Sequence, residues 1–303
     1  MNLLEAYKSY PFRVPVRVRF FNLFRLLFRI TPLERFLVRQ VGAGHRFWRR
    51  LIPPLYFYPT GSVRAVEREG IRYRLDISHE LEYSIYFGVV ADQAWDNLFR
   101  NLRKDLVIVD AGANIGYLTL QFAIRGRARW VHAFEPDSET FHKLARNVAL
   151  NRPCPVSLHR VALGSREGEA ELYRLYRHNP GTNRILTRKP ESSLSSETVP
   201  VITLDSLDEK GLFEEGIDLI KIDVEGFERF VLEGAEQVIR KYRPVLFVEL
   251  VDDNLIMQGV SGQSVVDLIR NFGYDVLDAK TMKPLVDADR YATDVYCLPD
   301  RHS

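Results

Sequence analysis

The sequence predicts an α/β fold in which helices cover both faces of a mostly parallel sheet. From about residue 106 onwards, short apolar segments typical of strands alternate with longer segments that have a helical pattern. A regular order of strand, helix and strand predicts a parallel sheet with helices on both faces. The predicted strands span residues 106–110, 130–135, 156–163, 218–223, 245–250 and 295–298, and the predicted helices span residues 117–124, 138–151, 227–242 and 263–272.

Two other parts of this domain have their own patterns. Residues 174–198 are polar and rich in Arg, Ser and Pro, which predicts a long loop or flap. Residues 62–67 and 71–77 flank Glu69-Gly70 and predict a β-hairpin, and a helical stretch over residues 80–103 follows. We therefore predict one domain over residues 61–303, in which residues 61–105 form a hairpin and helical lead-in.

Residues 1–60 predict an α-helical N-terminal extension rich in Arg and Phe. Residues 1–74 hold 15 Lys+Arg and 4 Asp+Glu, whereas the rest of the chain holds 27 and 36. One amphipathic helix is predicted over residues 20–30 and a second over residues 32–41. In the first helix, the polar side chains are Asn22, Arg25 and Arg29, and the apolar side chains on the opposite arc are Phe20, Phe24, Leu27 and Phe28.

This extension has three candidate partners. Basic amphipathic helices bind anionic membranes, so residues 12–58 are predicted to make a peripheral contact at the inner membrane face. The alternative is a cap whose apolar face packs on the core or on a second subunit of a homo-oligomer. An acidic partner is the third candidate, although no nucleic acid is expected because the core itself is acidic.

The cysteine content and the apolar stretches of the chain indicate the cellular compartment. Cys154 and Cys297 are the only cysteines, and two isolated cysteines in a chain of 303 residues predict neither a disulfide framework nor a zinc site. The longest apolar-looking stretch, residues 20–30, is too short and too charged to span a bilayer. We therefore expect a cytoplasmic protein.

The first predicted strand of the core leads into a turn that is typical of nucleotide-like ligands. The segment reads Asp110-Ala111-Gly112-Ala113-Asn114-Ile115-Gly116, and a helix is predicted to start near Ile115. Ligands of open α/β sheets bind beyond the carboxyl ends of the strands. Gly112 and Gly116 would let the backbone approach a ligand, and the helix start would offer free N–H groups to an anion. Because a third glycine at G-x-G-x-x-G spacing is missing, a pyrophosphate is disfavoured.

The next two predicted strands add to this candidate binding site. Residues 130–135 end in Glu135, followed by Pro136, and an acid at this place suits both hydroxyls of a ribose. The third strand ends near Ala162, which is predicted to flank an adenine. The predicted cofactor-binding residues are Asp110, Gly112, Ala113, Asn114, Gly116, Glu135, Pro136, Ala162 and Asp223.

A second group of charged residues follows the fourth predicted strand. Lys221 and Asp223 share one side of that strand by period-two alternation, and Glu225-Gly226 turn the chain into the next helix. The strand after it ends in Glu249. One interpretation is a buried ion pair that holds two strands together.

At this point the sequence resembles the FkbM-type methyltransferase family over about residues 80–298. The matching segments are Asp110 to Gly116, Phe134-Glu135-Pro136, Thr203-Leu204-Asp205-Ser206-Leu207, Lys221 to Gly226, and Arg243-Pro244 through Glu249. The resemblance implies a Rossmann-like class I methyltransferase fold with a seven-stranded sheet. It also implies S-adenosylmethionine as the methyl donor and a hydroxyl of a sugar or other metabolite as the acceptor.

Methyl transfer to a hydroxyl benefits from a base that takes the proton. Asp223 is the first candidate, Glu249 the second and Glu225 the third, while Lys221 favours a charged Asp223 or orients it. The same carboxylates are compatible with Mg²⁺, although no metal-binding residues are assigned. We expect O-methylation of a sugar, glycan or glycosylated metabolite. The alternatives are another small molecule, a lipid-linked acceptor at a membrane, a nucleic acid, or a binding module without activity.

Overall fold

A computed structural model describes residues 16–175, 181, 183–186 and 194–300. The chain divides into two compact units, which meet in sequence between Ala91 and Asp92. The predicted domain boundary at residues 60 and 61 therefore differs from the boundary between the units. The hairpin and the first lead-in helix belong to the N-terminal unit.

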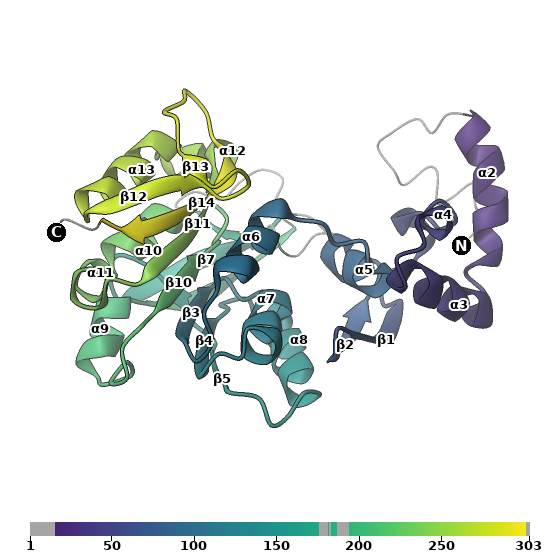
Figure 1. Ribbon diagram of the computed structural model, residues 1–303, viewed down its shortest axis with the longest axis horizontal. Helices are drawn as coiled ribbons and strands as arrows, with labels where there is room; N and C mark the ends of the chain where they lie inside the picture. Colours follow the sequence, from purple (N-terminus) through teal and green to yellow (C-terminus); the bar gives the residue numbers. More distant parts are fainter. Residues whose placement is uncertain (1–15, 176–180, 182, 187–193, 301–303) are drawn as a thin grey trace. The chain divides into compact units, whose positions relative to one another are not determined.

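The C-terminal unit is built on a mixed, mostly parallel sheet (Figure 1). Its strand order is β13-β12-β14-β11-β10-β3-β4-β5. The strands are β3 (Val107–Ala111), β4 (Trp130–Phe134), β5 (Val156–His159), β10 (Leu219–Ile222), β11 (Val245–Val251), β12 (Tyr274–Asp278), β13 (Lys283–Pro284) and β14 (Ala292–Pro299). The strands from β5 to β11 are parallel, and β14 pairs antiparallel with both β11 and β12.

The prediction of seven strands is wrong for this sheet, which has eight among the described residues. The extra strand is β13, because the chain turns back after β12 and two residues pair with Leu277 and Asp278. The sequence reading also omitted β12. Its pattern is weakly apolar, because two of its five residues are Asp275 and Asp278.

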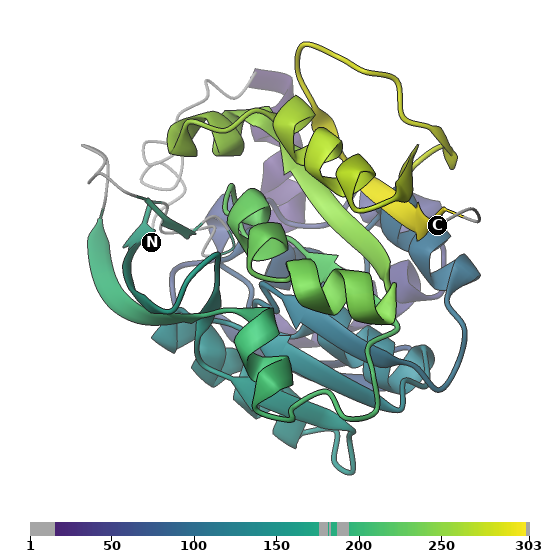
Figure 2. The same cartoon turned by 90° about the vertical axis from the view of Figure 1, so that its left-hand side faces the viewer.

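Alternate residues of the strands face two separate cores. On one side, Val109, Ile220 and Val248 pack with α10 (Glu228–Glu233), α11 (Glu236–Tyr242) and α13 (Gly262–Asn271), which Figure 2 shows in green in front of the sheet. On the other side, Ile108 and Leu219 pack with α6 (Gln93–Asn101), α7 (Tyr117–Leu120) and the π-helical turn over Gln121–Arg125. Helices on both faces bury the central strands β3 and β10 fully, which explains why these two read as continuous apolar segments.

The segment predicted to be a long loop or flap contributes to a second sheet. This sheet has the order β6-β9-β7-β8, with β6 (Ala162–Leu163), β7 (Gly168–Arg174), β8 (Arg184–Ile185) and β9 (Ser195–Ile202). Residues 176–180, 182 and 187–193 of the predicted flap lie outside the described residues. Arg174 ties this sheet to α8 (Ser138–Ala149), since its guanidinium contacts Asp137 at 2.7 Å and Glu197 at 2.6 Å.

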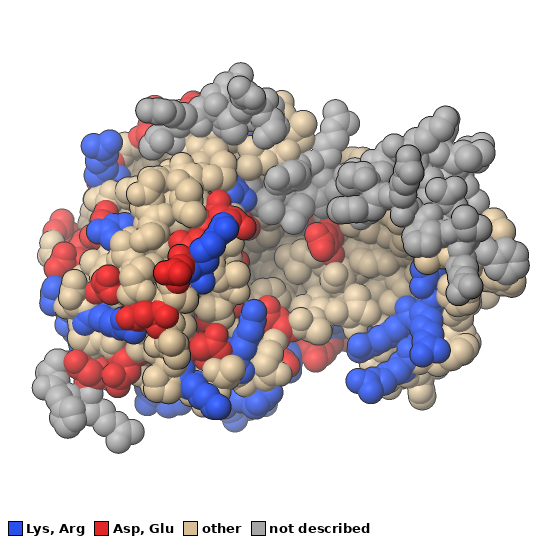
Figure 3. Space-filling view, turned by 90° about the horizontal axis from the view of Figure 1, so that it is seen from above, with Lys and Arg blue, Asp and Glu red and all other residues tan. Residues whose placement is uncertain are grey.

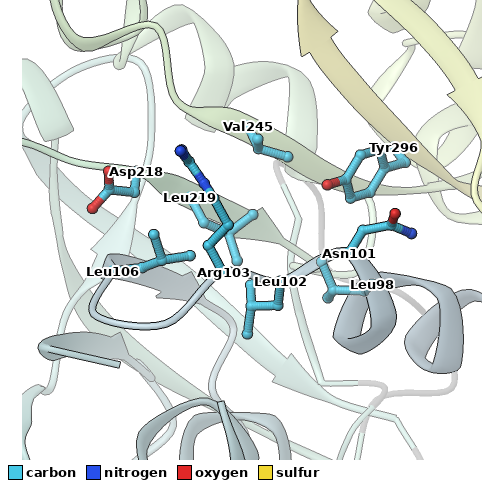
Figure 4. A pocket seen from close by; sticks show the side chains of 9 residues that line it. All are labelled: Leu98, Asn101, Leu102, Arg103, Leu106, Asp218, Leu219, Val245 and Tyr296. Carbon is cyan, nitrogen blue, oxygen red and sulfur yellow. The ribbon is translucent and has the colours of Figure 1, made fainter. Parts of the chain in front are cut away.

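Shorter helices complete the C-terminal unit, and a small cleft lies at the amino ends of its strands. The helices are α9 (Leu204–Glu209), α12 (Asp252–Leu255) and the 3-10 turn Ile256–Gln258. Leu106, Leu219, Val245 and Tyr296 line the cleft with the side chain of Asp218 (Figure 4). Ligands of such sheets bind at the carboxyl ends of the strands, and this cleft lies at the opposite edge.

The N-terminal unit joins three helices to a hairpin and a fourth helix. Its elements are α2 (Val16–Leu27), α3 (Thr31–Gly42), α4 (Arg46–Arg49), the 3-10 turn Leu55–Phe57, β1 (Val63–Arg68), β2 (Ile71–Asp76) and α5 (Glu80–Phe87). The predicted helix over residues 80–103 is broken, because Gly88 adopts a left-handed conformation that ends α5 before α6 begins. No helix among the described residues has the length and apolar character needed to cross a membrane.

A fully buried carboxylate holds this unit together. Glu34 of α3 accepts hydrogen bonds from Arg64 Nε of β1 at 2.6 Å, from Tyr58 at 3.2 Å and from Tyr86 of α5 at 2.9 Å. Three elements far apart in sequence therefore share one charged group, and each hydroxyl would be left without its acceptor if the group were removed.

Replacing Glu34 by Ala should destabilise the protein by about 3–5 kcal/mol, because breaking a buried ion pair leaves its partners uncompensated. Thermal or urea unfolding would measure the loss. Glu80→Ala at an exposed position serves as the control and should change stability by less than about 1 kcal/mol. Equal stabilities of the two variants would contradict the prediction.

Candidate active site

The turn after β3 lies where three strands end. Gly112 and Gly116 have φ values of +78° and +88°, and Asn114 has a φ of +51°. A Cβ atom on Gly112 would lie 1.8 Å from the backbone oxygen of Asp223, so glycine is required by the neighbouring strand end. A Cβ atom on Gly116 would lie 2.7 Å from Leu144. The space beside these two glycines, which was predicted to admit a ligand, is therefore filled by protein atoms.

The backbone N–H groups of this turn are bonded within the protein. The amides of Gly112 and Ala113 donate to Phe134 O, and the amide of Asn114 donates to Glu135 Oε2. The amides of Ile115 and Gly116 donate to groups within the turn itself. The prediction of free N–H groups for an anion is therefore wrong for residues 112–116. The helix that follows, α7, is only one turn long.

Beneath the turn, Lys221 of β10 connects the two predicted constellations. Its Nζ lies 3.1 Å from Asp110 Oδ1 and 3.6 Å from Asp223 Oδ2. It also donates hydrogen bonds to the carbonyl oxygens of Ala111 at 3.2 Å and Gly112 at 2.8 Å. Burial alone would lower the pKa of Lys221, but Asp110 and Asp223 raise it above its usual value, so the ammonium stays charged.

Asp110, like Lys221, is buried beneath the turn. Its side chain is fully buried, and Oδ2 accepts a hydrogen bond of 2.6 Å from Thr119 of α7. The sequence analysis placed Asp110 among the cofactor-binding residues, whereas in the structure its carboxylate lies below the turn, between Thr119 and Lys221.

Glu135 follows β4 directly and is 8% exposed. Its carboxylate accepts hydrogen bonds from the amide of Asn114 at 2.9 Å and from the amide of Asp137 at 3.0 Å. Burial raises the pKa of Glu135 to about 8. Each carboxylate oxygen accepts one of these bonds, and Pro136 next to it has no N–H that would compete.

Ala162 does not end a strand of the main sheet, which corrects the prediction for this residue. Strand β5 stops at His159, and the chain leaves the sheet over residues 160–161. Ala162 then pairs with Val201 in the second sheet and packs in its core. His159, stacked on Phe134 with ring centroids 4.5 Å apart, takes the position at the end of the third strand.

The predicted acids after β10 and β11 come together at the carboxyl edge of the sheet. Oxygens of Asp223, Glu225 and Glu249 all lie within 4.8 Å of one another. The turn between Asp223 and α10 bends sharply, because Glu225 and Gly226 have φ values of +58° and +101°. These three side chains are partly exposed, whereas Asp110 and Lys221 beneath them are not. We call Asp223, Glu225 and Glu249 the acidic cluster.

Burial and neighbouring carboxylates raise the pKa of two residues of the cluster, Glu225 and Glu249. Burial, followed by Asp223, raises the pKa of Glu225 to about 8. Burial and the nearby carboxylates of Asp223 and Glu225 also hold the pKa of Glu249 well above its usual value. Among the residues whose positions are known, none forms a hydrogen bond or ion pair with the Glu249 carboxylate. The Glu249 carboxylate thus accepts a proton more readily than that of an ordinary glutamate.

Sequence reasoning missed two charged residues beside the cluster. Asp294 of β14 pairs in register with Glu249, and burial raises its pKa to about 7. Arg184 of β8 is 7% exposed and lies 3.3 Å from Glu225 Oε2. Asn254 Nδ2 donates to the same Glu225 oxygen at 2.9 Å. Asp294 directly precedes the predicted strand over residues 295–298, and that position could have identified it from the sequence. Nothing in the polar segment distinguished Arg184.

The donor set of this edge suits S-adenosylmethionine. The sulfonium and ammonium groups of that molecule are cations, and the acidic cluster supplies negative charge at the strand ends. Glu135 offers carboxylate oxygens to ribose hydroxyls. The residues present therefore fit the cofactor through carboxylates, while the amides of residues 112–116 are already bonded within the protein.

Comparisons with known proteins agree with this geometry. The family model described as the methyltransferase FkbM domain matches residues 110–276. The chain is 30% identical to "Methyltransferase 1" of Beauveria bassiana, over 57% of this chain and 74% of that protein. It is 28% identical to the 31-O-demethyl-FK506 methyltransferase FkbM of Streptomyces tacrolimicus, over 64% and 82%. It is 29% identical to the hexuronic acid methyltransferase AglP of Haloferax volcanii, over 49% and 58%.

The matched region begins at Asp110 and includes Glu135, the acidic cluster and most of the main sheet. Residues 1–109 lie outside it. The chain is a member of the FkbM methyltransferase family, and its C-terminal unit is an S-adenosylmethionine-dependent methyltransferase domain.

Proposed function

We propose that the protein is an O-methyltransferase that acts on a hydroxyl of a sugar, glycan or glycosylated metabolite. The observation that carries the proposal is the acidic cluster, in which three carboxylates face one another at the strand ends beside the Gly112 turn. Carboxylates accept hydrogen bonds from hydroxyl groups, and a polyol offers several hydroxyls to such a cluster. When bound, S-adenosylmethionine supplies the electrophilic methyl group.

The role assigned to Glu249 is acceptance of the hydroxyl proton. A base works best when its pKa lies near the working pH, and burial with neighbouring carboxylates raises the pKa of Glu249 towards that range. Its carboxylate also has no competing partner in the described part of the chain. This reverses the order of the sequence analysis, in which Asp223 came first.

Asp223 and Glu225 are given positioning roles. Asp223 lies 3.6 Å from Lys221 Nζ and is the more exposed partner of that pair. Glu225 is held by Arg184 and Asn254. Much of the acceleration of a methyl transfer comes from alignment of donor and acceptor, which such held groups provide.

The names of two relatives favour a hydroxyl-bearing acceptor. One is called a 31-O-demethyl-FK506 methyltransferase, and another is called a hexuronic acid methyltransferase. A different small molecule, or a lipid-linked acceptor reached through the N-terminal unit, is the second candidate. Nucleic acid is disfavoured because the acidic cluster would repel phosphates.

Replacing Glu135 by Ala should weaken binding of S-adenosylmethionine roughly tenfold to a hundredfold, since the hydrogen bonds between the Glu135 carboxyl and the ribose hydroxyls are lost. Calorimetric titration would measure the dissociation constant, and Glu169→Ala on the exposed part of β7 is the control. Unchanged affinity in Glu135→Ala would remove Glu135 from the binding site. Absence of binding to the wild-type protein would overturn the proposed function as a whole.

The rate should rise with pH above the range in which a glutamate ordinarily titrates, because the carboxyl that accepts the proton has a raised pKa and must first lose its own proton. Glu249→Gln should lower kcat by roughly 10²–10⁴-fold and remove this rise. Asp294→Asn should keep activity and shift the rise to lower pH, because one nearby negative charge is lost. A full pH profile for an accepted sugar hydroxyl tests this, and an unshifted profile in both variants would contradict the assignment.

Binding of Mg²⁺ by the acidic cluster is a further prediction. Three carboxylates with oxygens within 4.8 Å of one another match the ligand chemistry of this ion. If the ion takes part, EDTA should abolish turnover, Mg²⁺ should restore it, and Glu225→Gln should raise the Mg²⁺ concentration needed. Full activity after chelation would contradict a role for Mg²⁺ and would mean that the carboxylates act without a metal ion.

A further inference from the structure

Helix α2 of the N-terminal unit is oriented with its polar side inward. The sequence pattern allowed a cap in which the apolar arc packs on the core. In the structure Asn22, on the polar arc, is fully buried, whereas Leu23, Phe24 and Leu27 are 52%, 51% and 53% exposed. Soluble proteins normally bury the apolar stripe of a surface helix, so this orientation points to another partner for that stripe.

Specific contacts hold α2 in this orientation. Asn22 Nδ2 donates a hydrogen bond of 2.9 Å to the hydroxyl of Tyr56. Arg25 Nε donates to the carbonyl oxygen of Arg50 at 2.8 Å, and Arg25 also donates to Asn22 Oδ1 at 3.0 Å. Because the polar arc is bonded to the chain after α4, the helix cannot turn its apolar arc inward without losing these bonds.

The exposed apolar side chains continue over the next two helices. The set spans residues 23–47, and every member is at least 39% exposed. We call it the apolar face; it consists of Leu23, Phe24, Leu27, Ile30, Leu33, Phe36 and Phe47. The rings of Phe36 and Phe47 both contact Trp48, with centroids 5.1 and 5.7 Å apart, which joins α3 to α4 on this face.

Exposed basic side chains lie on the same helices as the apolar face. Arg35, Arg39, Arg46 and Arg49 are exposed on the same helices. The single acid between residues 13 and 50 is Glu34, and its charge is compensated internally by Arg64. In Figure 3 the Lys and Arg of the N-terminal part form a group without acidic side chains among them, whereas both signs are interspersed over the C-terminal unit.

We propose that the apolar face binds the surface of an anionic lipid bilayer. Apolar side chains with arginines around them match the two layers of such a surface, because acyl chains receive the former and phosphates attract the latter. Since no described helix can cross a bilayer, the contact is interfacial. A second copy of the chain is disfavoured as the occupant, because its own arginines would meet these arginines.

The inference goes beyond the proposed function and does not depend on it. Lipid binding by the N-terminal unit requires neither S-adenosylmethionine nor an acceptor.

Flotation of the full-length protein with vesicles tests the proposal. Vesicles of phosphatidylcholine with phosphatidylglycerol should carry the protein to the top of the gradient, and vesicles of phosphatidylcholine alone should carry much less. Phe24→Ser/Leu27→Ser should reduce binding on the order of tenfold or more, since apolar area enters the interface. Arg46→Gln/Arg49→Gln should reduce binding by a similar factor and weaken its dependence on salt.

Matched controls come from exposed residues of the C-terminal unit. Leu194→Ser/Val286→Ser and Arg160→Gln/Arg166→Gln change equal numbers of exposed apolar and basic side chains. Both should bind vesicles as the wild type does, and unchanged thermal unfolding should show that every variant is folded. Failure of the wild type to float would overturn the proposal, as would equal binding to neutral vesicles. Loss of a dimer in Phe24→Ser/Leu27→Ser without any vesicle binding would assign the face to a second copy instead.

Discussion

The structure of the site depends on one buried ammonium. Lys221 reaches from β10 under the neighbouring strand end and satisfies Asp110, two backbone carbonyls of the glycine turn, and Asp223. A buried charge is tolerated only when such partners surround it. The close approach of Gly112 to the backbone of Asp223 follows from the same arrangement, because the two strand ends are drawn to a shared cation.

This arrangement couples the two halves of the chemistry. In the proposed reaction, the turn that begins at Asp110 belongs to the donor side, whereas the acidic cluster belongs to the acceptor side. Lys221 contacts both, at 2.8 Å from Gly112 O and at 3.6 Å from Asp223 Oδ2. A shift of one strand end would therefore move Lys221 relative to the other. Preorganised charges of this kind are most effective when their supporting groups are themselves fixed.

The sequence was sufficient for six strands of the main sheet, the Gly112 turn and the acids at the ends of β10 and β11, because strand periodicity and strand order determine where such residues lie. It was insufficient where tertiary contacts decide. Ala162 looked like the end of a strand, but the chain bends into a second sheet. The amides of residues 112–116 looked free, yet neighbouring groups use them. Asn22 lies on the polar arc of its helix, yet it is fully buried and forms hydrogen bonds with the hydroxyl of Tyr56 and with Arg25.

The position of β14 has a consequence for folding. This strand lies between β11 and β12, although it follows both in the chain. Strands β11 and β12 therefore cannot complete the sheet as they form, and a non-local insertion must come last, which slows folding. Until then two strand edges stay open to pairing with other molecules. Asp294 arrives with that strand, so a chain arrested at this stage would be prone to aggregate and would lack one of the carboxylates that adjust the basicity of Glu249.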